Sequence, residues 1–495
     1  MKAILVVGTT SHAGKSMLAT GLCRAFSRRG WRVSPFKGQN MALNSYVTPT
    51  GGEIGYAQAV QAWAAGVTPA VQMNPILLKP QGDMTSQVIL NGKAVGTVGA
   101  SEYYEKFFNP GWEAIKDSLK VLGNNFDVLV CEGAGSPAEI NLKHRDLTNM
   151  RIATYLNAPT ILVVDIDRGG SFAHVVGTLQ LLEPEERALI KGVVINKFRG
   201  QLSLLQSGID WLEEYTGIPV LGVIPWLNQL FPAEDSLSLL ERRNEKNHTD
   251  LTIAVILLPR ISNFTDFDPL EAEPTVKVKY IQPGQPLGHP DAVIIPGSKT
   301  TIPDLLTLQK SGMAEEIQNY VATGGTVLGI CGGFQMLGEL VADPEGIEGQ
   351  AGRFDGLNLL PLKTFLTYHK VSRQRQVVSN YPQMGLPIMG YEIHHGRSKI
   401  TNNEDIYQLF DDPSLGVTNL EQSVWGTYLH GIFDNSPWRR AWLNRLRYPR
   451  GLQTLPTGIP NYREQRETLF NNLADIIESN LNMTPILDLL ESRSL

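Results

Sequence analysis

The sequence predicts an α/β protein with two parallel-sheet domains in series. Short apolar runs alternate with helix-length amphipathic segments along most of the 495 residues, a pattern typical of parallel strands buried on both faces. The length exceeds what one hydrophobic core usually serves, so we expect two or three units. A polar stretch at 231–250 interrupts the pattern. We therefore predict a first domain over 1–235, a second over 250–445 and a partly helical tail over 446–495.

Five apolar runs carry the prediction for the first domain, and we expect each to be a strand: 3–7, 126–131, 161–165, 192–196 and 219–224. Leu18, Leu22 and Ala25 lie at helical spacing after the first run, and Gly30 is a typical stop. The second domain has further runs at 251–258, 291–298 and 325–330. Near the C-terminus, 468–481 has a helical pattern after a segment rich in proline and arginine.

Composition excludes some classes of protein. Hydrophobic residues make up 42% and charged residues 19% of the chain, and the formal net charge is −6. A nucleic-acid surface usually brings a basic excess, and a membrane span needs about 20 apolar residues in a row. We therefore expect neither partner. Three scattered cysteines favour a cytoplasmic protein without disulfides. The sequence does not indicate an oligomeric state.

The stretch "GTTSHAGKS" at 8–16 follows the first predicted strand and opens a helix. This is the setting of a phosphate-binding loop, in which backbone N–H groups hold phosphate oxygens. Lys15 would add a point charge and the Ser16 hydroxyl could ligate Mg²⁺. Five residues instead of the usual four separate Gly8 from Gly14. We predict ATP binding at Gly8, Thr9, Gly14, Lys15 and Ser16; the alternative is a structural turn.

A second candidate site centres on Cys331, which lies in "GICGG" between an apolar run and a helix signal. A tight strand-to-helix turn exposes its central side chain, and flanking glycines are needed where no Cβ fits. A thiol at a helix N-terminus also gains thiolate character. We predict a nucleophile; the alternative is a buried structural cysteine.

A cysteine nucleophile needs a base, and His430 follows the apolar run in "VWGTYLH". His394 and His395 are rivals, and a satisfied core histidine is the alternative role for His430. For the oxyanion of the reaction, backbone N–H groups of the "PGS" turn and of the cysteine turn are candidates. These groups belong to Gly297, Ser298 and Gly332.

The long phosphate loop resembles that of the dethiobiotin-synthetase group of ATP enzymes, which activate carboxylates. This resemblance implies that Lys37, in "SPFKGQN", lies near the γ-phosphate and stabilises the transferring phosphoryl group; the alternative is a solvated lysine. Glu132 ends a predicted strand and is a candidate second Mg²⁺ ligand, or else a capping residue. Glu53 is a weaker metal candidate.

The cysteine turn, the distal histidine and the "PGS" turn resemble class I glutamine amidotransferases, which release ammonia from glutamine through a thioester. Most of that class carry H-x-E, in which the glutamate orients the histidine, whereas this chain reads His430-Gly431-Ile432. Either the cysteine and histidine work as a dyad, or the orienting group comes from elsewhere. The departure resembles the cobalamin-pathway branch of the class.

The two domains together resemble the cobalamin-pathway glutamine amidotransferase family. Long strings carry this resemblance: "PFKGQNMALNS", "EIGYAQAVQAWAAG", "NPILLKPQGDMTSQVILNGK", "EGAGSPAEINL", "DIDRGGSFAHVVGT" and "INKFRG". They resemble the branch that amidates the b, d, e and g carboxylates of adenosylcobyrinic acid a,c-diamide. The resemblance implies a corrinoid substrate, ATP, Mg²⁺ and glutamine as ammonia donor.

Other functions remain open at this point. The sibling branch, which makes the a,c-diamide, shares the domain order, and a ParA/MinD-like ATPase module would use a similar sheet without needing Cys331. Residues that hold the substrate are harder to predict. We place them in loops near the acyl-phosphate site, with Asp83, Asp165 and Arg168 as candidates.

Overall fold

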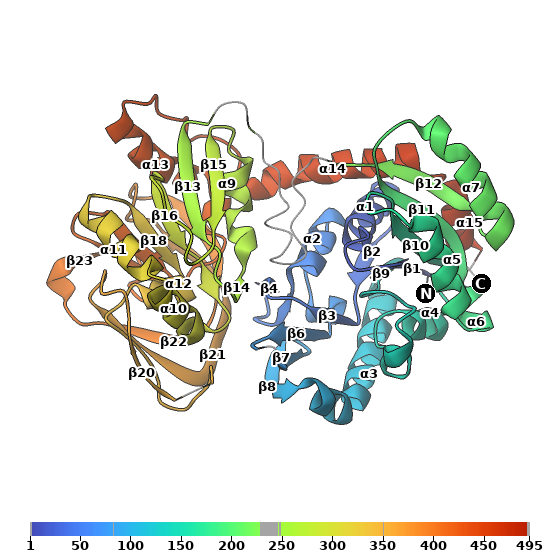
Figure 1. Ribbon diagram of the computed structural model, residues 1–495, viewed down its shortest axis with the longest axis horizontal. Coiled ribbons are helices and arrows are strands. Elements are labelled where there is room, and N and C mark those ends of the chain that lie inside the picture. Colours follow the sequence, from blue (N-terminus) through green and yellow to red (C-terminus); the bar gives the residue numbers. More distant parts are fainter. Residues whose placement is uncertain (1, 83, 228–245, 247–248, 350, 493–495) are drawn as a thin grey trace.

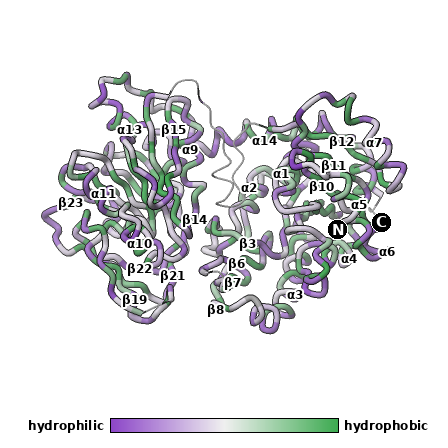
Figure 2. The backbone as a smooth tube through the Cα atoms, viewed as in Figure 1, coloured by the Kyte–Doolittle hydropathy of each residue, from purple (hydrophilic) through white to green (hydrophobic). Residues whose placement is uncertain are grey.

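The computed structural model describes residues 2–82, 84–227, 246, 249–349 and 351–492. It forms two lobes, each built around a mainly parallel sheet (Figure 1). Apolar positions gather around the central strands of each lobe (Figure 2). Most of the predicted connection at 231–250, and Asp83, lie outside the described residues. No helix in the described part of the chain has an apolar stretch long enough to span a bilayer.

The first lobe contains a six-stranded sheet of order β12-β11-β10-β1-β9-β2, in which all neighbours are parallel. Side chains of β1 alternate between two cores: Ile4 and Val6 face one, and Leu5 and Val7 face the other. This explains the uninterrupted apolar runs. The strands are β1 (Lys2–Gly8), β2 (Val33–Phe36), β9 (Val128–Glu132), β10 (Thr160–Asp165), β11 (Ile190–Phe198) and β12 (Val220–Pro225).

Helices cover both faces of this sheet. They are α1 (Lys15–Arg28), α2 (Tyr56–Ala64), α3 (Ala100–Asn125), α4 (Met150–Leu156), α5 (Ser171–Leu181), α6 (Pro184–Arg187) and α7 (Leu202–Thr216), with short 3₁₀ turns η1 (Val71–Met73) and η2 (Ile140–Arg145). The predicted helix after the first strand is α1, and Gly30 follows it with φ of 84°.

The first lobe also has two small sheets that the sequence analysis did not anticipate. One has the order β3-β6-β7-β8, and the other is a β4–β5 hairpin that reaches toward the second lobe (Figure 1). Their strands are too short to give a clear pattern. They are β3 (Gln39–Met41), β4 (Ser45–Val47), β5 (Glu53–Gly55), β6 (Ile76–Pro80), β7 (Thr85–Leu90) and β8 (Lys93–Gly99).

The second lobe has a seven-stranded sheet of order β15-β13-β16-β18-β25-β24-β23. Its first five strands are parallel and the last two antiparallel. They are β13 (Leu251–Ile256), β15 (Val276–Ile281), β16 (Ala292–Ile295), β18 (Val327–Ile330), β23 (Ile406–Gln408), β24 (Gly416–Asn419) and β25 (Val424–Thr427). The helical elements are η3 (Phe264–Phe267), α9 (Asp268–Ala272), α10 (Thr301–Lys310), α11 (Met313–Ala322), α12 (Gly332–Met336), η4 (Asn403–Asp405), η5 (Ile432–Asp434), α13 (Ser436–Arg447) and η6 (Tyr448–Arg450).

A long antiparallel hairpin faces the first lobe. It consists of β21 (Leu362–Val378) and β22 (Pro387–Ile400), and β19 (Leu340–Asp343) and β20 (Gly352–Asp355) extend it into a four-stranded sheet. The charged, partly exposed sequence of β21 hides this strand from a search for apolar runs. A two-stranded pair, β14 (Ile261–Ser262) with β17 (Gly297–Ser298), lies close to the cysteine turn.

The C-terminal segment returns to the first lobe. Helices α14 (Tyr462–Asn480) and α15 (Thr484–Glu491) follow the second lobe in sequence, and α14 crosses from one lobe to the other (Figure 1). It packs against α1 so closely that a Cβ on Gly21 would lie 2.0 Å from Ile477 Cδ1. Arg24 and Glu467 pair across the two helices at 2.8 Å. The predicted tail is therefore helical and completes one core of the first lobe.

Candidate active sites

The phosphate-type loop follows β1 at the carboxyl edge of the first sheet, where parallel strands place their ligand-binding groups. Gly14 begins α1 with φ of 101°, and a Cβ there would lie 2.0 Å from Asn196 Nδ2. Asn196, near the end of β11, donates to the carbonyl of Ala13 at 2.8 Å. Only glycine fits at position 14, and Asn196 is a supporting residue that the sequence analysis missed.

Lys15 is almost fully buried in this loop. Its Nζ donates to the carbonyls of Thr10 at 3.0 Å and Gly135 at 3.1 Å. The ammonium group therefore lies where the loop after β1 meets the loop after β9. Thr9 anchors the loop by donating its N–H to the carbonyl of Val163 at 2.9 Å.

Glu132, the last residue of β9, collects three side chains around its carboxylate. Ser16 Oγ and Lys37 Nζ each donate to Oε1 at 2.7 Å, and Gln61 Nε2 donates to Oε2 at 2.5 Å. The structure thus brings together Ser16, Lys37 and Glu132, which the sequence analysis placed at one site. Gln61, on α2, was missed because nothing in its helical surroundings marks it.

Glu53 lies elsewhere. Its two carboxylate oxygens accept from Lys79 Nζ at 2.6 Å and Lys370 Nζ at 2.5 Å, so a lysine from each lobe pairs with it. Burial raises the pKa of Glu53, but the two ammonium groups outweigh burial and hold it well below its usual value. The metal role of Glu53 stays a prediction; both of its oxygens pair with lysines, and these pairs join the lobes.

The candidate substrate residues lie at the end of β10 and in the loop after it, next to β1 at the same carboxyl edge. Asp165 Oδ2 accepts from Lys197 Nζ at 2.7 Å, and Arg168 Nε lies 3.9 Å from the same oxygen. Asp165 is buried, whereas the Arg168 side chain is 57% exposed. Asp83 lies outside the described residues. Asp165 and Arg168 therefore neighbour the phosphate-type loop but are not part of the Glu132 cluster.

Cys331 occupies the strained turn expected for a nucleophile. It follows β18 and precedes α12 with φ of 51° and ψ of −103°, a rare conformation for a residue with a side chain. A Cβ on Gly333 would lie 1.9 Å from the Ile295 carbonyl oxygen, and one on Gly329 would lie 2.6 Å from that of Gly333. The glycines are required by close backbone contacts, as the sequence pattern suggested.

The backbone around the turn also fits a site for a developing oxyanion. A Cβ on Gly332 would lie 2.9 Å from the backbone nitrogen of Ser298, so the two segments approach very closely. Ser298 belongs to β17, and its hydroxyl donates to Asp304 Oδ2 at 2.6 Å. Burial raises the pKa of Asp304 to about 6, although the hydrogen bond from Ser298 opposes the shift. Gly297, Ser298 and Gly332 thus lie together beside Cys331.

His430 follows β25 and is oriented by a carboxylate that the sequence analysis did not identify. Its Nδ1 donates to Asp266 Oδ2 at 2.7 Å, although Asp266 lies 164 residues earlier in the chain. The other oxygen of Asp266 accepts the Gly431 N–H at 2.8 Å. This geometry fixes the tautomer, because a carboxylate only accepts. The orienting group therefore comes from elsewhere in the chain, in η3, one of the two possibilities left open above.

The second ring nitrogen of His430, Nε2, is buried without a conventional hydrogen bond to any described residue. Burial lowers the pKa of His430, but Asp266 and, to a smaller extent, Cys331 outweigh burial and raise it to about 10. Geometry places the ring beside the cysteine turn: a Cβ on Gly297 would lie 3.2 Å from His430 Cε1, and the next residue, Ser298, closely approaches Gly332.

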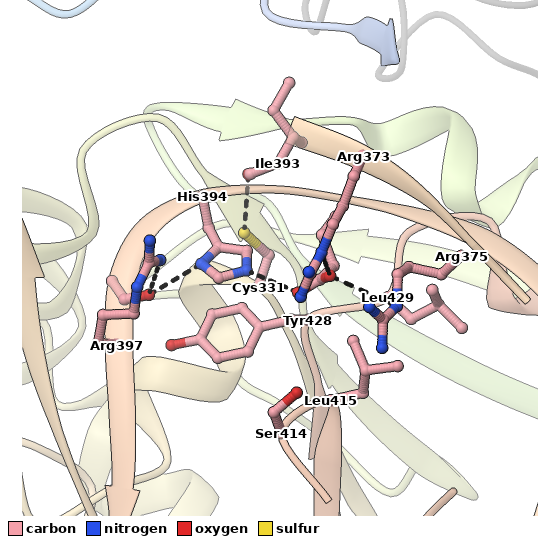
Figure 3. Close-up of polar contacts among 12 residues, drawn as sticks. Cys331, Arg373, Arg375, Ile393, His394, Arg397, Ser414, Leu415, Tyr428 and Leu429 are labelled. Carbon is pink, nitrogen blue, oxygen red and sulfur yellow. Dashed lines mark hydrogen bonds and ion pairs between the residues drawn. The ribbon is translucent and has the colours of Figure 1, made fainter. Parts of the chain in front are cut away.

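The rival histidines, His394 and His395, line the cavity that also reaches the thiol. Cys331 Sγ is 3.6 Å from the Ile393 carbonyl oxygen, beside the ring of His394, which stacks on Tyr428 (Figure 3). Both His394 nitrogens have partners: Gly396 O at 2.8 Å and Glu392 Oε1 at 3.3 Å. Burial lowers the pKa of His394, and burial with nearby lysines lowers that of His395 to about 3. Neither histidine has the orienting carboxylate and free nitrogen of His430.

A cavity of about 40 Å³ opens beside the thiol. Its lining combines neutral groups such as Gln335 with charged groups from both lobes. Lys299 and Glu348 face it from the second lobe, with no hydrogen bond or ion pair between them, and Lys79 faces it from the first. Burial lowers the pKa of Lys299 and raises that of Glu348, each to about 7. Lys299 and Glu348 attract each other, but they make no direct ion pair of the kind that joins Lys79 to Glu53.

Two family profiles match the chain in the order of the lobes. The CobQ/CobB/MinD/ParA nucleotide binding domain matches residues 4–239, and the CobB/CobQ-like glutamine amidotransferase domain matches residues 252–438. The prediction of an α/β nucleotide-binding domain followed by an amidotransferase domain is confirmed.

Curated relatives match nearly the whole chain. A cobyric acid synthase from Trichormus variabilis is 72% identical over 487 residues, which is 98% of this chain and 99% of the relative. One from Nostoc punctiforme is 72% identical over 493 residues, covering 98% and 100%. One from Synechococcus elongatus is 63% identical over 488 residues, covering 98% and 99%.

Proposed function

Because the chain belongs to the family of cobyric acid synthases, we propose that it amidates the b, d, e and g carboxylates of adenosylcobyrinic acid a,c-diamide. The observation that carries this proposal is the combination, in one chain, of the Glu132 cluster and the Cys331–His430–Asp266 arrangement. A carboxylate is a poor acyl donor, so one site must activate it and the other must supply ammonia. The enzyme is a glutamine-dependent amidoligase.

In the first lobe, ATP would convert the substrate carboxylate to an acyl phosphate. The loop from Gly8 to Ser16 would hold the phosphates through Thr9, Gly14 and backbone N–H groups, and Lys15 and Lys37 would neutralise charge on the transferring phosphoryl group. The buried positions of both lysines support these roles, because a low-dielectric site strengthens their effect. Asp165 and Arg168 remain candidates for contacts to the corrinoid.

Ser16 and Glu132 are the residues that would hold Mg²⁺. Their oxygens are 2.7 Å apart, which fits two ligands of one small cation. Among the described residues, no cluster of three or more His, Cys, Asp or Glu side chains forms a ready metal site, so phosphate oxygens and water would complete the coordination. Bound there, Mg²⁺ would neutralise charge on the β- and γ-phosphates.

In the second lobe, Cys331 Sγ would attack the carboxamide carbon of glutamine. The oxyanion would be stabilised by backbone N–H groups of the segment formed by Gly297, Ser298 and Gly332. His430 Nε2 would take the thiol proton, give it to the leaving ammonia, and then take a proton from the water that hydrolyses the thioester. Asp266 would hold the ring in place throughout. The raised pKa of His430 supports this role as proton donor.

The charged groups of the cavity suit the head group of glutamine. Glutamine carries an α-ammonium and an α-carboxylate a few bonds from the carboxamide that must reach Cys331. Glu348 would accept from the ammonium and Lys299 would pair with the carboxylate, so each would gain a direct ionic partner. Because the cavity is smaller than glutamine, flexible side chains such as Lys370 would move aside on binding.

Buried polar side chains lie between Glu53 and Glu132 and support our proposal of a sheltered path for ammonia. Starting beside Glu53, Gly55 N–H donates to Asn74 Oδ1, Asn40 donates to Gln58, and Gln61 donates to Glu132. Gln58 Nε2 and Gln61 Oε1 are buried without hydrogen-bond partners among the described residues. Such groups could solvate a passing ammonia molecule, which bulk water at neutral pH would protonate.

The path can be tested by narrowing it. A Cβ at position 55 would lie 2.4 Å from Asn40 Nδ2, so Gly55→Ala should obstruct the polar file. We expect fewer amides formed per glutamine hydrolysed, while ammonium-dependent synthesis is kept. Gly177→Ala, at an open position in α5, is the matched control. An unchanged ratio of amides to glutamine in Gly55→Ala would contradict the path.

The proposed reaction is tested by mass spectrometry of the corrinoid product with amide-¹⁵N glutamine and ATP. Four labelled nitrogens should enter adenosylcobyrinic acid a,c-diamide. Consumption of cobyrinic acid with labelling at the a and c side chains would favour the sibling diamide synthase. ATP hydrolysis without any glutaminase activity would favour a ParA/MinD-like module, which the nucleotide-binding match alone does not exclude. A cytoplasmic location stays a prediction from cysteine usage.

A further inference from the structure

One short segment of the first lobe reaches both candidate sites. Lys37 pairs with Glu132 at the phosphate site, and seven residues later Asn44 and Ser45 contact the second lobe. Asn44 and Ser45 are buried, and β4, which begins at Ser45, lies next to β14 where the lobes meet (Figure 1). Residues 37–45 therefore extend from the phosphate site to the second lobe within a single stretch of chain.

Asn44 and Ser45, at the far end of this segment, form hydrogen bonds with the turn that carries Asp266. Asn44 Oδ1 accepts the N–H of Phe264 at 3.0 Å, and Ser45 N–H donates to Asn263 Oδ1 at 3.0 Å. Asn263, with φ of 52°, precedes η3, which contains Asp266. The first N–H of a helical turn has no partner inside the turn. Without Asn44, the Phe264 N–H would be a buried donor lacking this partner.

The same segment also supports the side chain that stacks on a face of the catalytic ring. Tyr391 OH donates to the Ser45 carbonyl at 3.1 Å. The Tyr391 ring stacks on His430 with centroids 5.4 Å apart and 23° between the planes. Tyr391 and His430 also exchange two backbone hydrogen bonds, at 3.1 and 2.9 Å. Both neighbours that fix the imidazole, Asp266 and Tyr391, are thus tied to residues 44–45 of the other lobe.

We propose that Asn44 is a positioning residue for the glutaminase reaction, acting through η3 and Asp266 on His430. The inference rests on the proposed function of the Cys331 site. It also provides a physical link between the sites. In the proposed function Lys37 contacts the transferring phosphoryl group and Glu132 contacts Mg²⁺, so nucleotide binding would alter the Lys37–Glu132 pair, and a shift of this segment would reach Asp266 through Asn44. Through this link, the first lobe controls whether His430 is positioned for the reaction at Cys331.

The test uses Asn44→Ala in the full chain. The glutaminase kcat should fall by between about ten- and a hundredfold, the KM for glutamine should stay within about twofold, and ammonium-dependent amidation should be unchanged. Ser372→Ala is the matched control, because it removes another hydrogen bond between the lobes, from Ser372 Oγ to the Gly51 carbonyl. Equal loss of the glutamine- and ammonium-dependent activities, or kinetics like those of Ser372→Ala, would overturn the proposal.

A second variant covers the case in which Asn44→Ala does not fold. Asn263→Gly keeps the positive φ and removes the acceptor of Ser45 N–H, so the same fall in kcat is expected. The link is measured as the ratio of glutaminase rates with and without ATP, Mg²⁺ and corrinoid. This ratio should exceed one in the unmodified enzyme and approach one in Asn44→Ala; equal ratios would overturn the link. Cys331→Ala, assayed in parallel, separates this result from failure of the proposed function, which would appear as glutaminase activity that survives without the thiol.

Discussion

The two candidate sites differ in how far along the chain their parts lie. The Glu132 cluster takes every side chain from the first lobe, and each follows or faces a strand end of one parallel sheet. The Cys331 site joins a turn after β18, a histidine after β25 and Asp266 from η3, and it depends on the other lobe for support. The first site is set by the topology of a sheet, whereas the second is completed only by tertiary contacts between lobes.

The strongest test of this comparison is removal of the thiol. We expect Cys331→Ala to lower glutamine-dependent amidation by more than about a thousandfold, because no other group can form the thioester. Ammonium-dependent amidation should stay close to that of the unmodified enzyme, since the first lobe is complete in itself. Corrinoid amide formation with each nitrogen source measures both. Loss of both activities in a folded protein would mean that the sites are not separable.

A matching test removes charge from the first site. Lys15→Ala should lower amidation from either nitrogen source by about a hundred- to a thousandfold, because its charge stabilises the phosphoryl group that both routes require. Glutamine hydrolysis at Cys331 should continue. Lys93→Ala, an exposed lysine on β8, is the control. Retained ammonium-dependent synthesis in Lys15→Ala would show that the carboxylate is activated elsewhere.

The role of Asp266 sharpens the comparison, since it is the most distant part of the second site. Asp266→Asn removes the charge that raises the pKa of His430, and burial then lowers that pKa. We expect glutaminase kcat to fall by about a hundredfold and the alkaline limb of the kcat profile, near pH 10 in the unmodified enzyme, to move to lower pH.

The same pair contributes to stability. The pKa of His430 is raised from 6.5 to about 10 on folding, so its contribution is fully present below pH 6.5 and is lost as the pH rises through 10. Thermal unfolding of Asp266→Asn and the unmodified enzyme should therefore differ more at pH 6 than at pH 10. An unshifted kcat profile in Asp266→Asn would contradict the orienting role.

The smallest expected effects concern the glutamine head group. Lys299→Met and Glu348→Gln should each raise the KM for glutamine by about tenfold, the value of one charged hydrogen bond. Compared with the unmodified enzyme, Lys299→Met should discriminate less between glutamine and glutaminamide, in which the α-carboxylate is replaced. Glu348→Gln should discriminate less between glutamine and Nα-acetylglutamine, in which the α-ammonium is replaced. Alkylation of Cys331 by iodoacetamide, which has no head group, should be unchanged. If both variants lose discrimination against the same analogue, the assignment of the two partners is wrong.

The two sites also differ in how much of each could be predicted from the sequence. Buried strands, the phosphate-type loop and the meeting of Ser16, Lys37 and Glu132 depend on local patterns and on the rule that parallel strands end at one edge. Asp266 depends on neither: it lies in "NFTDFDP" among other acidic residues, and only folding brings it to His430. Lys370 was hidden for the same reason, because it lies 317 residues from Glu53. Strand β21 was hidden by its charged, partly exposed sequence.

Because α14 and α15 return to the first lobe, residues 1–235 alone do not make up that lobe. The amidotransferase lobe is inserted into the sequence of the synthetase lobe. The last two helices of the synthetase lobe follow the amidotransferase lobe in the chain, so the chain passes between the lobes twice. Residues 1–235 expressed alone would leave uncovered the surface that Leu473 and Ile477 bury. Co-expression with 446–495 should restore solubility.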